Sequence, residues 1–171
     1  MSIVKQRGLA LVDIGIGMIV LLTALTLTYR LVYGVGDMVM KKYEIDNFAE
    51  HVFDGMEFAF WDNFAETRCL TPPTITLSSL ESDRFIRSEY IEDTWFTASE
   101  ASIEFVENPN SILPTALQIV VPIIANSKYA MNTKYSAGMD SSGDLILKRP
   151  ISPTISSKLR LNMTSSGCDS L

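Results

Sequence analysis

A single carboxylate, Asp13, lies near the start of a long apolar stretch and is the residue of this sequence with the clearest chemical potential. The basic residues Lys5 and Arg7 precede the stretch, which then runs for about twenty residues with almost no other charge. A charged group inside a membrane-length apolar segment is costly to bury and seldom lies there without a partner. If the chain is cut after Gly8, a new α-amino group appears on Leu9, four residues before Asp13. The sequence then predicts a carboxylate and an ammonium at one end of the same apolar helix.

The segment around Asp13 resembles the N-terminus of type IV pilins and of the related type II secretion pseudopilins. The matching features are the basic leader that ends in Gly8, the residues Leu11 and Val12 before the acid, and the apolar run from Ile14 to Leu27. The resemblance covers about the first 35 residues. It implies a pilin-like protein, in which a long helix carries a globular head.

Two residues depart from the usual pilin pattern, because Leu9 stands where the family most often has Phe, and Asp13 where it has Glu. The resemblance implies that a prepilin peptidase cleaves between Gly8 and Leu9 and N-methylates Leu9. It further implies that Asp13 pairs with the α-amino group of Leu9 in an adjacent subunit. The peptidase of the family accepts other first residues, whereas Asp13 has one methylene less reach than Glu.

The resemblance implies a structural subunit of a type IV pilus, and the atypical Leu9 and Asp13 favour a minor subunit. Its partners are then the prepilin peptidase, other pilin subunits that pack through the N-terminal helix, and the bacterial inner membrane. The precursor is expected to cross that membrane once with a cytoplasmic N-terminus, because Lys5 and Arg7 directly precede the span. The mature protein is expected in the periplasm or the extracellular pilus. A pseudopilin of a type II secretion system is the alternative within the family.

Two other interpretations of the apolar stretch stay open. A secretory signal peptide also has a basic start and an apolar core, and the residues 34–36 would suit its cleavage site, although the core is longer than usual. An uncleaved anchor of a periplasmic binding module is the other alternative, since about twenty apolar residues span a bilayer. Neither alternative explains an acid at the fifth position after Gly8.

The two cysteines, Cys69 and Cys168, suit an exported domain. Two thiols delivered to an oxidising compartment are most simply interpreted as one disulfide, which would tie the C-terminus to the end of the first helix. Pilins commonly have a disulfide to a cysteine near the C-terminus, so this pairing agrees with the resemblance. A pair of free or buried thiols is the alternative.

The charge balance argues against nucleic acid as a partner. The chain has 14 basic and 20 acidic residues and a formal net charge of −6, and its Lys and Arg residues are scattered. Binding to nucleic acid depends on neutralising phosphates with a basic surface. No nucleic-acid partner is therefore predicted.

The sequence has no pattern of catalytic or metal-binding residues. The single histidine, His51, falls on the polar side of an expected helix, and there is no CxxC pair or nucleophile motif. The run Asp140 to Asp144 lacks the alternating oxygen ligands of a calcium loop and is interpreted as a turn. We therefore predict no enzymatic activity, no metal and no cofactor.

The pattern of apolar residues predicts that the helix continues far beyond the membrane segment. Between residues 41 and 66 the apolar residues recur at steps of three and four: Ile45, Phe48, Val52, Met56, Ala59 or Phe60, and Phe64. The residues between them are mostly charged or polar. We therefore expect a leader over 1–8, a transmembrane and filament-core helix over 9–35, its amphipathic continuation over 36–68, and a head over 69–171.

The head is expected to be rich in β-structure. A break between Cys69 and Pro73 ends the helix, because paired prolines cannot continue it. Extended segments are predicted at residues 74–77, 101–106, 115–124, 143–147 and 158–163, and a short helix is permitted within 78–97. Pro122 places the end of its segment at a sheet edge or a bulge. The predicted fold class is α+β, with the long helix packed on a C-terminal antiparallel sheet.

Overall fold

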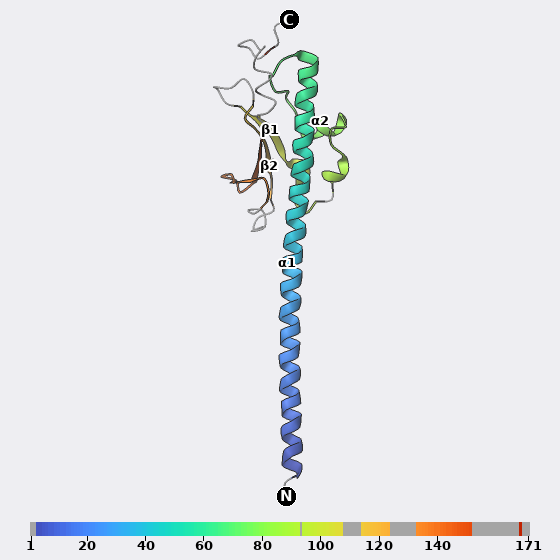
Figure 1. Cartoon of the computed structure of the whole chain (residues 1–171), viewed down its shortest axis with the longest axis vertical. Helices are drawn as coiled ribbons and strands as arrows, with labels where there is room; N and C mark the ends of the chain where they lie inside the picture. The colour runs from blue at the N-terminus through green and yellow to red at the C-terminus, as the bar shows by residue number, and fades with distance from the viewer. Residues whose placement is uncertain (1–2, 93, 108–113, 124–132, 152–167, 169–171) are drawn as a thin grey trace. The chain divides into compact units, whose positions relative to one another are not determined.

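A computed structural model shows two compact units, Met1–Met40 and Lys41–Leu171. It describes residues 3–92, 94–107, 114–123, 133–151 and 168, and only the backbone for residues 3–13. Helix α1 (Ile3–Thr67) begins in the first unit and ends in the second (Figure 1). The predicted borders of the leader, membrane segment and head remain predictions.

The helical backbone of α1 is continuous through four glycines. These are Gly15, Gly17, Gly34 and Gly36. A Cβ atom built on any of them would meet nothing within 4 Å. A helix interior disfavours glycine by only about 1 kcal/mol relative to alanine, and α1 stays helical through all four positions.

The second half of α1 buries the predicted apolar row. Ile45, Phe48, Val52 and Met56 are each at most 1% exposed, and Ala59 and Phe60 follow at 7% and 2%. Phe64 is only half-buried, at the end of the row. A parallel row of Ala49 and Phe53 is also fully buried, which widens the apolar face that the sequence predicts.

Helix α1 ends where the sequence predicts. Its last residue is Thr67, and Arg68 adopts a left-handed backbone with φ of 58°. Pro72 and Pro73 then prevent α1 from continuing through this segment.

The predicted strand at residues 74–77 is wrong, because Leu77 begins the helix α2 (Leu77–Ser82) instead. Thr76 is the N-cap of α2, and its hydroxyl accepts a hydrogen bond from the Ser79 backbone N–H. The Ser79 hydroxyl lies 2.9 Å from the Thr76 backbone N–H, which completes a capping box. Two 3₁₀ turns, η1 (Ser88–Tyr90) and η2 (Ala98–Glu100), follow, so the helix permitted between residues 78 and 97 is α2 with η1.

In the part of the chain that the structure describes, four antiparallel strands, of which Figure 1 labels β1 and β2, form one sheet in the order β1-β2-β4-β3. Their bounds are β1 Ser102–Val106, β2 Ala116–Val121, β3 Ser136–Met139 and β4 Leu145–Pro150. Extended structure is therefore confirmed in the segments 101–106, 115–124 and 143–147. The segment predicted at 158–163 lies outside the described residues.

The expectation for Pro122 is wrong in detail. Strand β2 pairs with β1 on one side and β4 on the other, so it is a central strand of the sheet. It ends at Val121, directly before the proline. Pro122 has no N–H to donate and therefore ends the strand instead of placing it at an edge.

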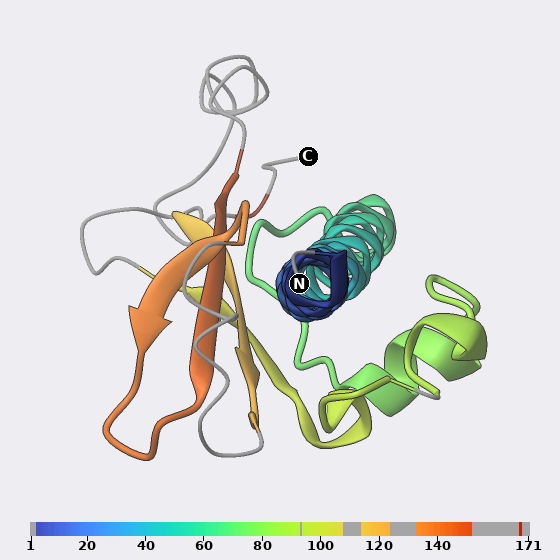
Figure 2. The same cartoon turned by 90° about the horizontal axis from the view of Figure 1, so that it is seen from below.

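The core lies between the sheet and the second half of α1. Leu117, Ile119 and Val121 of β2, with Leu145 and Leu147 of β4, are at most 1% exposed and join the buried row of α1 in one cluster. Leu77 and Leu80 of α2 extend the same cluster. Figures 1 and 2 both show the sheet on one side of this part of α1 and α2 on another. The predicted α+β class, a long helix packed on an antiparallel sheet, is confirmed.

Candidate functional site

The first unit exposes nearly all of its apolar side chains. From Ile14 to Met40 the large apolar residues are each at least 46% exposed, and the most apolar window of α1, with a mean hydropathy of 1.8, is 0% buried. Within the described residues, α1 is long and apolar enough to cross a membrane. This surface is the candidate site for contact with lipid or with other helices.

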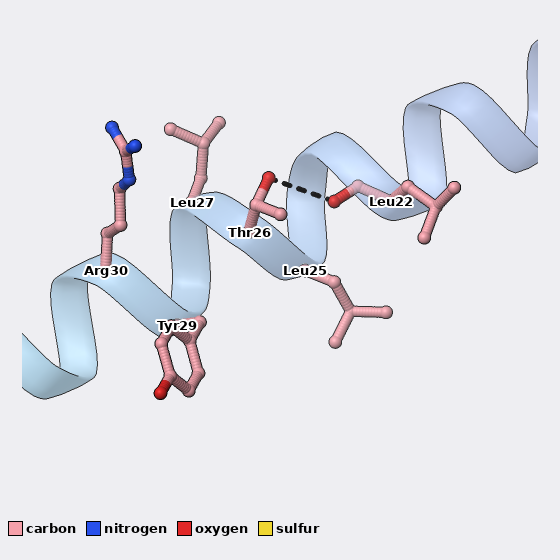
Figure 3. A pocket seen from close by; sticks show the side chains of 6 residues that line it. All are labelled: Leu22, Leu25, Thr26, Leu27, Tyr29 and Arg30. Atoms are coloured by element: carbon pink, nitrogen blue, oxygen red, sulfur yellow. Dashed lines mark hydrogen bonds between the residues drawn. The ribbon is translucent and has the colours of Figure 1, made fainter.

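The threonines of the apolar segment have satisfied hydroxyl groups. The Thr26 hydroxyl donates to the Leu22 carbonyl at 3.0 Å (Figure 3), and the Thr28 hydroxyl donates to the carbonyl of Ala24 at 2.8 Å. Thr23 donates in the same way to the preceding turn, 2.9 Å from the Ile19 oxygen. Polar groups bonded within their own helix are tolerated in lipid, so these three residues do not oppose membrane insertion.

The residues predicted to be cleaved and methylated, and those predicted to form the charge pair, lie in the helical part of α1. Gly8, Leu9 and Asp13 are all in its first turns, but their side chains are outside the described part of the structure. Helical geometry places Asp13 about 6 Å beyond Leu9 along the axis and on the same face. Cleavage, methylation and the charge pair therefore stay predictions.

The predicted disulfide is present. The sulfur atoms of Cys69 and Cys168 lie 2.02 Å apart, and the two residues also form an isolated antiparallel bridge. Cys69 lies two residues after the end of α1, so the bond ties the C-terminal end of the chain to that of the helix. The bond closes a loop with a sequence separation of 99 residues.

The other residues that the sequence analysis considered for chemistry, His51 and the run Asp140 to Asp144, make ordinary structural contacts. The His51 ring stacks on Tyr90, with ring centroids 3.6 Å apart. Asp140 Oδ1 accepts hydrogen bonds from the backbone N–H groups of Ser142 and Asp144, which confirms the turn between β3 and β4. Among the residues that the structure describes, no three His, Cys, Asp or Glu side chains are grouped to hold a metal ion.

A row of carboxylates on α1, which the sequence analysis did not single out, faces Lys134 in the turn before β3 and Arg149 of β4. Asp46 Oδ1 accepts the backbone N–H of Lys134 at 2.8 Å, and Glu50 pairs with the Lys134 ammonium at 3.3 Å. Asp54 and Glu57 both pair with Arg149. Their positions 46, 50, 54 and 57 follow the helical repeat, and this spacing was the signal available in the sequence.

The described structure therefore defines a class of protein: an α+β head whose core helix continues an apolar, membrane-length helical segment. Comparison with family models, with curated proteins and with solved structures found no match to this chain.

Proposed function

We propose that this protein is a minor structural subunit of a type IV pilus. Its precursor is inserted in the bacterial inner membrane, is cleaved after Gly8, and assembles into a filament through its apolar helix. The protein has no catalytic role in this proposal. The head would face the periplasm before assembly and the surface of the filament afterwards.

The exposed apolar surface between Ile14 and Met40 is the observation that carries the proposal. Burying a single large apolar side chain stabilises by about 1.5–3 kcal/mol, so a surface of this extent needs an apolar environment. A membrane supplies that environment to the first part of this surface in the precursor, and the helices of neighbouring subunits supply it to the whole surface in a filament. The same helix continues into the core of the head.

Two further features support export and assembly. The Cys69–Cys168 disulfide suits a domain that folds in an oxidising compartment. The pilin-like positions of Gly8, Leu9 and Asp13 offer a cleavage point and an acid near the new N-terminus. In an apolar filament core, an ammonium–carboxylate pair would favour one register, because a displaced neighbour leaves a charge without a partner.

The test is the intact mass of the full chain, produced in a cell that has a prepilin peptidase and purified from its membranes. The proposal expects a mass that begins at Leu9 with one added methyl group, and a gain of two daltons on reduction. Gly8→Val should leave the precursor uncut, while Gly15→Val is the matched control and should be processed normally.

Other masses would contradict the proposal. A mass beginning at Met1 or Ser2 indicates an uncleaved anchor, and one beginning at Asp37 indicates a secretory signal peptide removed after Gly36. If processing occurs, antibody against the head should detect the protein in sheared pili. Its exclusion from pili and retention in a secretion complex would favour the pseudopilin alternative.

A further inference from the structure

The apolar segment of α1 contains a group of three amphipathic side chains, Tyr29, Arg30 and Tyr33. The tyrosines are 59% and 63% exposed, and their ring centroids lie 4.1 Å apart, one turn from each other on the same face. Arg30 is also exposed. Figure 3 shows Arg30 and Tyr29 extending from different sides of the helix, so the group is not confined to a single face.

The position of this group matches the thickness of a bilayer. From Leu9 to Tyr29 is twenty helical steps, which at 1.5 Å each span about 30 Å. The hydrocarbon core of a typical bilayer is about 30 Å thick. A helix that enters the hydrocarbon near Leu9, just after the basic Lys5 and Arg7, therefore leaves it at Tyr29.

The chemistry of the three side chains suits the boundary between hydrocarbon and water. Tyrosine is enriched there, because its ring prefers the apolar side and its hydroxyl the polar side. The aliphatic stem of arginine lies along apolar surface while its guanidinium reaches outward, where it forms paired hydrogen bonds with phosphate oxygens.

An alternative boundary lies further along the helix, close to Asp37 and the start of the second unit at Lys41. With this later boundary, Arg30 would lie about 10 Å inside the hydrocarbon. Arg30 and Asp37 are the only charged side chains between residues 14 and 40. The earlier boundary places Asp13 about 6 Å inside the hydrocarbon, whereas the later one places Arg30 about 10 Å inside it. A charge is less favourable the deeper it lies in the hydrocarbon, which argues for the earlier boundary.

We propose that Tyr29, Arg30 and Tyr33 bind the phosphate headgroups of the periplasmic leaflet and fix the depth of α1 in the membrane. The inference rests on the membrane insertion that the proposed function includes. It adds a ligand class, the phospholipid headgroup, and a place where the helix leaves the hydrocarbon. Residues 31–40 then lie in the headgroup layer or beyond it.

Cysteine accessibility in the full-length precursor tests this depth. We would reconstitute the precursor in vesicles of phosphatidylethanolamine and phosphatidylglycerol, with the head outside, and treat these vesicles with a membrane-impermeant maleimide. The variants are Val20→Cys, Leu27→Cys, Val35→Cys and Met40→Cys. The parent chain is the background control, because its two cysteines are joined in the disulfide. Cysteines at 20 and 27 should be protected, and those at 35 and 40 should be labelled.

A second variant tests the role of the guanidinium. Arg30→Gln in the Val35→Cys background should let the helix sink, so that labelling at residue 35 falls several-fold. Arg84→Gln, which removes an exposed arginine of the head, is the matched control and should leave that labelling unchanged. Unchanged labelling with Arg30→Gln would overturn the headgroup role of Arg30.

The outcomes separate this inference from the proposed function. Protection at residue 35 with labelling at 40 would move the boundary and overturn the inference, while membrane insertion and the pilin proposal would stand. Labelling at all four positions, including residue 20, would show that α1 does not cross the bilayer. That result would count against the proposed function itself.

Discussion

Arg149 Nη1 lies 2.7 Å from Asp54 Oδ1, so a charge-assisted hydrogen bond joins β4 to α1. The same guanidinium donates through Nη2 to Glu57 at 2.9 Å and lies 5.2 Å from the centre of the Phe53 ring. The Arg149 side chain is 19% exposed, and the carboxylates are 50% and 36% exposed. This arrangement is more sheltered than an ordinary surface ion pair, and it fixes the sheet against the helix that would carry the head.

Removing the guanidinium should therefore destabilise the head. Arg149→Met keeps a long stem over Phe53 but loses both hydrogen bonds, and we expect the free energy of unfolding to fall by about 1–2 kcal/mol. Denaturant unfolding of the full chain in detergent, followed by the near-ultraviolet signal of the core aromatics, measures the loss. Lys148→Met, at an exposed neighbouring position of β4, is the control. Equal effects of the two substitutions would contradict this role of Arg149.

Alanine is usually favoured over glycine in a helix interior, but at position 55 we expect glycine to be the more stable residue. A Cβ atom there would lie 2.6 Å from Ile86 Cγ2 and 3.4 Å from the Phe85 carbonyl oxygen. Overpacking a core costs about 1–3 kcal/mol, against a gain of about 1 kcal/mol in helix propensity. We expect Gly55→Ala to lower the melting temperature of the head. Gly36→Ala, whose Cβ would meet nothing within 4 Å, should not lower it.

The sequence was sufficient to predict the elements that depend on local patterns. The recurrence of Ile45, Phe48, Val52 and Met56 identified the buried face of α1, because a helical repeat of apolar residues needs no knowledge of its partner. The disulfide was predictable for a different reason. With only two cysteines in the chain, one pairing was available.

Features that depend on distant partners were not predicted. Strand β3 was missed, because Ser136 to Met139 contains few residues that favour strands, and a register irregularity lies between Ser136 and Gly138. At residues 74–77 the β-branched residues suggested a strand, whereas Thr76 caps a helix. The helical spacing marks the carboxylates of α1, but nothing in the sequence indicates that Arg149, 95 positions from Asp54, is their partner.

Reduction of the Cys69–Cys168 disulfide should weaken the head without changing its fold class. In the chain-entropy account, a bond that closes about 100 residues stabilises by up to about 4.7 kcal/mol, although measured values are often smaller. We expect a lower melting temperature for the Cys69→Ser, Cys168→Ser double variant, measured by circular dichroism in detergent. Treatment with reductant should lower the melting temperature of the parent chain and leave that of the double variant unchanged. An equal melting temperature in all four samples would contradict the prediction.

The contribution of the Lys134 ammonium to the stability of the head should be lost at alkaline pH. Tyr135 first, and then Glu50, raise the pKa of the Lys134 ammonium above its ordinary value of 10.5. A raised pKa in the folded state gives stabilisation that is complete below the unfolded pKa and is lost as the pH rises through the folded pKa. The difference in unfolding free energy between the parent chain and Lys134→Met should therefore stay constant up to about pH 10 and shrink as the pH rises above about 10.5. This higher pH range is the one to measure. A difference that stays constant over this range would contradict the contribution of the charge.

Asp13 provides the sharpest test of the filament proposal. If its carboxylate pairs with the Leu9 ammonium of an adjacent subunit in an apolar core, Asp13→Ala leaves that ammonium without a partner. The incorporation of this subunit into sheared pili, measured by immunoblot against the membrane-bound amount, should fall by at least about tenfold, equivalent to about 1.4 kcal/mol. Asp13→Glu retains the carboxylate and should assemble. Asp37→Ala removes the other acid between residues 9 and 40 and is the matched control. Normal incorporation of Asp13→Ala would show that the carboxylate does not set the register, and the apolar surface of α1 alone would then have to specify how the subunit packs.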